Sequence, residues 1–182
     1  MRCIIKRILI PLLLLLPAAH AFTQSFNTSK GTISFRSDAP LELITASSNE
    51  IRGKLDTAKK VFAFAVKIRS FNGFNSPLQK EHFNENYMES NEYPDAFFSG
   101  KIIEDIDFSK NGTYTIRAKG NLSVHGVPQE RIIKSIIIVN NGTLQIKSNF
   151  TVQLSDHNIP IPKVVHEKLA SEINVEVTAD MK

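Results

Sequence analysis

Apolar and polar residues alternate with a period of two along most of this chain, which predicts β-strands. The clearest run is 114–124, where every second residue is apolar or small and the residues between them are polar. Such one-sided strands are typical of antiparallel sheets, which bury one face and expose the other. We count about eight or nine strands in total. They are expected at 32–37, 41–46, 51–57, 61–69, 95–107, 114–124, 131–139, 143–154 and 172–179.

Turn signals separate these strands. Asn-Gly pairs at 111–112 and 141–142 supply the positive φ angles that tight hairpins need, and His125-Gly126 breaks the chain before the next run. That run, 131–139, is apolar on both sides, and we expect another element to cover one of them.

One helix is expected at 77–88. Ser76 is a good N-cap, Pro77 suits the first helical position and Gln79 completes a capping box. A shorter helical turn is expected near 162–169. Many one-sided strands with short turns and one short helix predict an all-β fold, an antiparallel β-barrel that leaves no sheet edge exposed.

The first residues are typical of a secretory signal peptide. Arg2, Lys6 and Arg7 precede an apolar run at 8–16, and Ala19-His20-Ala21 fits the small-x-small cleavage pattern. The run is shorter than the roughly 20 residues of a membrane span. We therefore predict a signal peptide at 1–21, one domain at 22–182, and a periplasmic or secreted product. An uncleaved membrane anchor is the alternative.

Removing that segment changes the charge and the cysteine content. The formal charge of +4 falls to +1, because 19 Lys and Arg then face 18 Asp and Glu. No basic patch remains, so we expect no nucleic-acid partner. The single cysteine, Cys3, precedes the apolar run, and its position is wrong for a lipid-modified cysteine.

No catalytic or cofactor motif is evident, and we predict no enzyme activity, no cofactor and no metal. The chain contains no HExxH, CxxC or GxSxG pattern and no glycine-rich phosphate loop. His125, Asp156 and His157 lie near expected strand ends and could form a metal or acid–base site. The alternative is that His125 is a turn residue and Asp156 caps a loop.

The interior of such a barrel is either filled by its own side chains or holds one small ligand. Ala118, Gly120 and Ser148 are small residues on otherwise apolar faces and would leave room. The pattern leaves a cavity and a packed core equally open.

Three stretches resemble the YceI-like family. Residues 81–100 resemble a short helix that leads through Tyr93-Pro94 into a long strand. Residues 114–127 match at Gly120, Leu122, His125, Gly126 and Val127, and 154–159 match at Asp156 and Ile159. The chain departs from the family where no histidine follows Ile33-Ser34-Phe35, and where His157-Asn158 replaces an aromatic residue and a glycine. It therefore resembles a divergent branch.

The resemblance implies an extended, lipocalin-like barrel of about eight strands with a helix packed against it. It also implies export in a Gram-negative cell and, in some relatives, a polyisoprenoid chain inside the barrel. Our first hypothesis is therefore a lipid-binding module for an isoprenoid or fatty chain. Its expected ligand-binding residues are Phe62, Phe64, Val66, Ile116, Leu122, Ile136, Phe150 and Val152 in the barrel, with Phe83 and Tyr87 at its mouth.

Two other hypotheses remain open. One is a hydrolase or metal site around His125 and Asp156. The other is a packed barrel that presents its surface, for example around Pro160-Ile161-Pro162, to a membrane or a secreted partner. Transient membrane contact and a homodimer are both compatible with the sequence.

Overall fold

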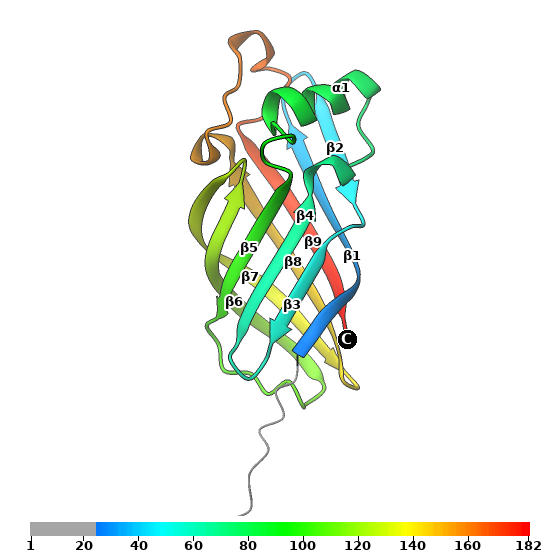
Figure 1. The fold of residues 1–182 in the computed structure, drawn as a ribbon, viewed down its shortest axis with the longest axis vertical. Coiled ribbons are helices and arrows are strands. Elements are labelled where there is room, and N and C mark those ends of the chain that lie inside the picture. The colour runs from blue at the N-terminus through cyan, green and yellow to red at the C-terminus, as the bar shows by residue number, and fades with distance from the viewer. Residues whose placement is uncertain (1–24) are drawn as a thin grey trace, which may run out of the picture.

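The computed structural model describes residues 25–182 and shows a closed antiparallel barrel (Figure 1). The predicted signal peptide, 1–21, lies outside the described residues. The strands are β1 (Ser25–Asp38), β2 (Leu43–Ser48), β3 (Arg52–Asp56), β4 (Val61–Lys67), β5 (Asp95–Ile102), β6 (Gly112–Val124), β7 (Val127–Asn140), β8 (Thr143–Gln153) and β9 (Glu172–Met181). The prediction of an all-β antiparallel barrel is confirmed.

β1 closes the barrel and is the most heavily paired strand. One of its edges pairs with β9, and its other edge pairs first with β3 and then with β2. Among the described strands β2 pairs with β1 alone, so the remaining eight form the ring. β2 and β3 thus pair one after the other with the same edge of β1. Of these two strands, only β3 also pairs with β4.

Two hairpins have the expected glycine turns. Asn141 and Gly142 have φ angles of 46° and 77°, and His125 and Gly126 have φ angles of 51° and 71°. Both residues of each pair lie in the left-handed region, as tight two-residue hairpins require. The third predicted turn, at Asn111-Gly112, is wrong. Asn111 is the last residue of a long connection between β5 and β6 and not part of a tight hairpin. Its side chain accepts a hydrogen bond from the Asn141 backbone N–H at 2.8 Å.

β5 is shorter than predicted and ends at Ile102. The chain then forms an irregular loop, 103–111, from which the buried Phe108 side chain enters the barrel interior. Glu104 fixes this loop to β6 by accepting hydrogen bonds from the backbone N–H and the Nε of Arg117. The loop therefore closes one end of the barrel, called here the hairpin end.

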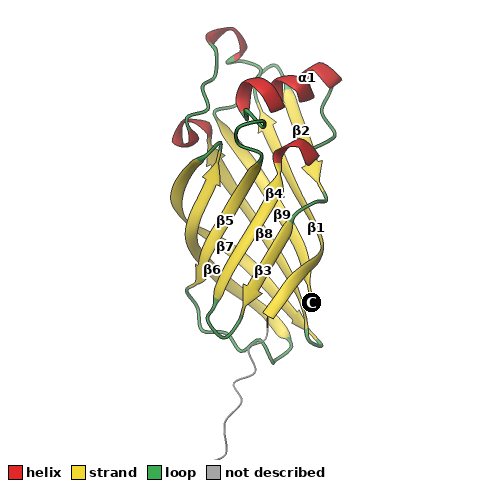
Figure 2. Ribbon diagram, viewed as in Figure 1, coloured by secondary structure: helices red, strands yellow, loops and turns green. Residues whose placement is uncertain are grey.

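The other end, called here the helix end, carries the helices (Figure 2). α1 (Pro77–His82) continues into a π-helical turn, η2 (Phe83–Tyr87), over nearly the predicted range. Ser76 accepts a hydrogen bond from the Gln79 backbone N–H at 3.1 Å and caps α1 as predicted. Three 3₁₀ turns complete the helical elements of the described residues, η1 (Ile68–Ser70), η3 (Leu154–His157) and η4 (Lys163–Val165). None of the helices in 25–182 has the length and apolarity to cross a membrane.

The structure corrects the predicted orientation of Ile136. On β7, Ile133, Ser135 and Ile137 point inward, so Ile136 points outward between Thr115 and Lys147 and is 40% exposed. Side chains alternate along a strand, and the inward serine concealed the register in the sequence. No described element covers this outer face, where Ile132 is 57% exposed.

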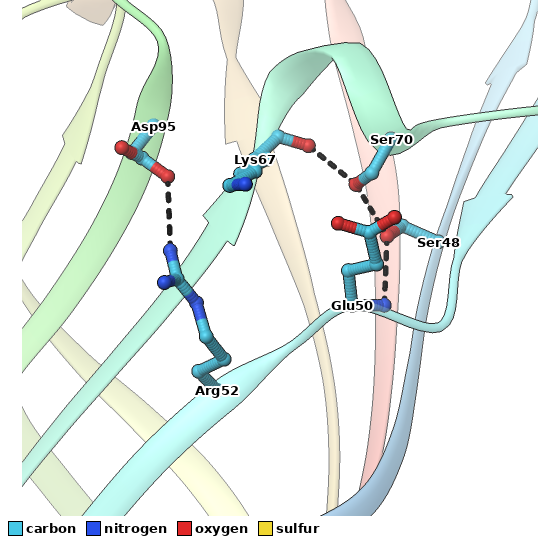
Figure 3. A network of polar contacts seen from close by, with 6 residues as sticks. All are labelled: Ser48, Glu50, Arg52, Lys67, Ser70 and Asp95. Atoms are coloured by element: carbon cyan, nitrogen blue, oxygen red, sulfur yellow. Dashed lines mark hydrogen bonds and ion pairs between the residues drawn. The ribbon is translucent and has the colours of Figure 1, made fainter.

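A chain of hydrogen bonds connects β2 to the end of β4, although these two strands do not pair with each other (Figure 3). The Glu50 N–H donates to Ser48 Oγ at 3.0 Å, and Ser70 Oγ donates to the Lys67 carbonyl at 2.6 Å. Because the Ser70 proton is used in this way, Ser48 is the donor in its 2.6 Å contact with Ser70. The chain thus ties the β2–β3 junction to η1 at the end of β4.

Candidate functional site

The helix end of the barrel contains a cavity of about 480 Å³, called here the outer chamber. Its wall combines strand residues such as Val175 with Tyr87 of η2 and Leu169 of the segment after η4. The lining is mostly apolar. Leu78 also lines it and is 57% exposed, so the chamber reaches the surface beside α1. The volume lies within the range typical of small-molecule pockets.

Four phenylalanines cap the outer chamber. Phe83 of η2 stacks on Phe35 of β1 at 5.3 Å between ring centroids, and it also contacts Phe74 at 5.0 Å and Phe71 at 5.9 Å. All four line the chamber. Phe71 belongs to one buried cluster with Ala46 of β2 and Val66 of β4, so the aromatic cap packs against two strands that do not pair with each other.

Polar groups lie at the rim of the outer chamber. Glu42, Gln79, His82 and Lys168 are among its lining residues. The Gln79 amide donates to the Glu42 carboxylate at 2.9 Å, which joins α1 to the segment before β2. The arrangement is suited to an amphiphile, with a dry interior for a tail and a polar rim for a head group.

A second cavity of about 110 Å³, the inner chamber, lies deeper in the barrel. Ala118 and Ser148 line it, as expected for small residues that leave room, and Ser135 adds a third. Ser135 and Ser148 hydrogen-bond each other at 2.5 Å, so the wall offers little unsatisfied polarity. Gly120 leaves no room. A Cβ there would lie 2.2 Å from the Ser99 carbonyl oxygen, so its absence lets β5 and β6 approach closely.

Below the inner chamber the hairpin end is packed. Phe26, Phe108, Leu144 and Met181 belong to one buried cluster, and each is at most 7% exposed. The barrel is therefore hollow towards the helix end and filled towards the hairpin end.

The structure brings nine of the ten predicted ligand-binding residues to the chamber walls. The outer chamber is lined by Phe83, Tyr87 and Val152, the inner chamber by Phe62, Phe64 and Ile116, and both by Val66, Leu122 and Phe150. Ile136 lines neither chamber, because it points outward. Contact with a ligand stays a prediction for all of them.

The sequence pattern missed the aromatic cap. Phe71 and Phe74 lie in a segment without alternation, and Phe35 was assigned to a strand without a role. Two phenylalanines around Asn72-Gly73 in an otherwise polar loop were the available signal, because exposed loops seldom carry large aromatic side chains.

His125 contacts His157, but through the His157 backbone, and its carboxylate partner is Glu89 rather than Asp156. Its Nε2 lies 2.6 Å from the Glu89 carboxylate, and its Nδ1 lies 3.1 Å from the His157 carbonyl oxygen. No contact between His125 and the Asp156 carboxylate occurs within the described residues, and Asp156 is exposed. His125 is a turn residue, as the alternative interpretation held, that ties the β6–β7 hairpin to η3 and to the segment after η2.

Neighbouring groups show no convergent acid–base arrangement. Tyr93 packs its ring edge against His125 at 4.7 Å and donates to Glu92, and that hydrogen bond raises the pKa of Tyr93. His157 is fully buried and its Nδ1 lies 2.9 Å from the Val127 carbonyl oxygen. Residues 25–182 contain no group of three or more His, Cys, Asp or Glu placed to hold a metal ion.

The comparison with known families decides the identity of the fold. The YceI-like domain model matches residues 18–181. The chain belongs to the YceI-like domain family. The predicted resemblance to this family is therefore confirmed, although no curated protein matches the chain.

Solved structures share the fold of this YceI-like chain at low identity. A polyisoprenoid binding domain from Saccharophagus degradans, implicated in plant cell wall breakdown, has a TM-score of 0.74 and 11% identity over 86% of this chain and 97% of that one. BcnA of Burkholderia cenocepacia has a TM-score of 0.68 and 14% identity, with 82% and 95% covered. A YceI protein of Campylobacter jejuni has a TM-score of 0.54 and 16% identity, with 98% and 90% covered.

Proposed function

We propose that this YceI-like protein binds the long apolar chain of an isoprenoid or fatty lipid inside its barrel and acts by holding that lipid rather than by catalysis. The observation that carries the proposal is the apolar outer chamber with a polar rim. Each methylene buried there would contribute about 0.8 kcal/mol. The family and the S. degradans domain, described as polyisoprenoid binding, support the same ligand class.

Export belongs to this proposal. The signal-like segment at 1–21 supports cleavage after Ala21 and work in the periplasm or outside the cell. N-terminal sequencing of the exported protein tests this, and a chain that begins at Met1 contradicts it. The homodimer stays a prediction.

The proposal is tested by asking what the purified protein carries. Protein prepared from the periplasm is examined by native mass spectrometry and by organic extraction, and lipid-stripped protein is titrated with a dansyl-labelled farnesol. We expect a bound lipid and uptake of the probe at one site. Protein free of lipid that also takes up no probe contradicts the function.

A matched pair of variants locates the probe. Val152→Phe narrows the outer chamber, because Val152 lines it and is only 7% exposed. Val164→Phe makes the same change at a side chain that is 89% exposed. We expect the first to weaken probe binding on the order of tenfold, a loss of about 1.4 kcal/mol, and the second to leave it unchanged. Equal effects would place the probe outside the chamber.

Transient membrane contact would give the lipid a route into the barrel. Leu41, Leu78 and Val164 are 66%, 57% and 89% exposed. The Leu41 N–H donates to the Glu167 carbonyl and the Gln79 amide donates to the Glu42 carboxylate, so all three side chains lie on segments that are joined to one another. We expect Leu78→Asp with Val164→Asp to slow transfer of the probe from vesicles while its affinity in solution is retained. Unchanged transfer contradicts this route.

The competing hypotheses gain less support. An enzyme built on His125 and Asp156 lacks the required pairing, and a fully packed barrel does not fit a cavity of about 480 Å³.

A further inference from the structure

The two chambers are stacked along the barrel and share a ring of side chains. Along β8, Ile146 and Ser148 line the inner chamber, Phe150 lines both, and Val152 lines the outer chamber. The same order recurs on other strands: on β6, for instance, Ala118 is inner, Leu122 is shared and Val124 is outer. A tail that enters beside α1 must therefore pass the shared level before it reaches the inner chamber.

Five residues form that shared level, one from each of five strands. They are Ile33 of β1, Val66 of β4, Ala96 of β5, Leu122 of β6 and Phe150 of β8. All are apolar, so the passage provides no polar contact that would compensate a head group for lost water. The shared level therefore favours a hydrocarbon tail over a charged or hydrated group.

The inner chamber ends on the packed hairpin end. Phe62 and Ile137 line it and belong to the buried cluster that also contains Phe108 and Leu144. From Ile146 to Val152 the two chambers follow β8 for about 20 Å at the usual strand rise. With a strand tilt of about 40°, that is about 15 Å along the barrel axis. The space for a tail therefore has a fixed length.

We propose that the inner chamber is a distinct subsite for the far end of a single lipid tail, and that the five-residue ring and the floor beneath it select ligands by tail length. The inference rests on the proposed function and refines it. The substrate class is a single-tailed lipid with its head group at the rim. A tail that stops above the ring leaves the inner chamber unused, and a tail longer than the chambers must leave its excess outside.

A length series of probes tests this selection. Geraniol, farnesol, geranylgeraniol and solanesol, in order of increasing length, compete with dansyl-farnesol on the wild-type protein. We expect affinity to rise with length until the inner chamber is filled and then to stay level. The variant Ala96→Phe places a ring in the passage, and Ala63→Phe makes the same change at an exposed position on β4.

The expected result is a shift in the length at which affinity stops rising. In Ala96→Phe, the affinity should stop rising at a shorter probe, and the affinity for the longer probes should fall on the order of tenfold or more. The shortest probe that binds the wild type should be affected little, and Ala63→Phe should behave as wild type. Ser148→Leu fills the inner chamber without touching the ring, and it should give the same shift if Ala96→Phe fails to fold.

The outcomes separate this inference from the function on which it rests. If the wild type binds no probe of any length, the proposed lipid binding fails. If probes bind but folded Ala96→Phe and Ser148→Leu level off at the wild-type length, lipid binding stands and the inner subsite is wrong. If the two variants lose affinity for probes of all lengths equally, the substitutions disturb the whole cavity rather than its inner end, and selection by length is wrong.

Discussion

The two halves of this barrel share the same strands and the same alternation, yet one half is packed and the other is hollow. At the hairpin end, Phe26, Phe108 and Met181 belong to one cluster and are almost fully buried. At the helix end, Val152, Ile173 and Val175 are buried as well, but they border a cavity of about 480 Å³. Burial alone therefore does not indicate a filled core.

The difference arises from how each end is closed. The 103–111 loop inserts Phe108 between the strands, whereas the helix end is covered from outside by α1, η2 and the aromatic cap. A side chain that enters the barrel fills part of its interior, whereas elements that cover the open end leave the interior empty. The comparison predicts that substitutions act mainly on stability in one half and mainly on ligand binding in the other.

The largest expected effect contrasts one leucine from each half. Leu144→Ala in the packed half should lower the free energy of unfolding by about 4 kcal/mol, because Leu144 is almost fully buried and lines neither chamber. Leu154→Ala should cost about 2 kcal/mol, because Leu154 lines the outer chamber and a side chain that borders a cavity has fewer contacts to lose. Urea denaturation of the lipid-stripped proteins measures both. Equal losses would contradict the division into a packed half and a hollow half.

The next effect concerns the hydrogen-bond chain that joins η1 to the β2–β3 junction (Figure 3). Ser48→Ala should cost about 1–2 kcal/mol, because it removes the acceptor of the Glu50 N–H and the hydrogen bond that Ser48 donates to Ser70 Oγ. The loss should be local, so amide exchange at the Ser47–Asn72 bridge should accelerate while the amides of β7 stay protected. Ser47→Ala, at an exposed neighbour, is the control. Uniform acceleration along the barrel would show that this junction unfolds with the whole.

A smaller effect is expected at the cap of α1. Ser76→Ala removes the acceptor for the Gln79 N–H and should cost about 1 kcal/mol. Because α1 and η2 cover the outer chamber, exchange of their amides should rise and release of bound dansyl-farnesol should accelerate. If stopped-flow release is unchanged while the helix loosens, the lipid leaves by another route.

The smallest effect is a pH dependence at the hairpin end. Hydrogen bonds from Arg117 lower the pKa of Glu104, so this carboxylate stabilises the fold above its ordinary pKa of 4.5. The contribution is lost as the pH falls through the lower value that applies in the folded protein. Glu104→Gln should therefore flatten the dependence of the urea midpoint on pH below about 4.5. A profile identical to wild type would show that the carboxylate contributes nothing to closing this end.

Much of the fold could be predicted because alternation, turns and caps are local properties. Asn141-Gly142 and Ser76 behave as their sequence signals indicate. Predictions failed where apolar residues occupied both faces or where the chain left the sheet. Ile136 points outward on such a two-sided strand, and the loop after Ile102 was taken for more strand.

The sequence by itself determined which residues face inward on most strands, and therefore that the chain closes into a barrel with a dry interior. Only the tertiary structure decided where that interior is filled. Whether Phe108 enters the barrel, or Phe83 covers it, depends on the path of a loop and a helix through space. Side-chain direction follows from the period of the backbone, whereas cavity volume depends on contacts between residues far apart in the chain.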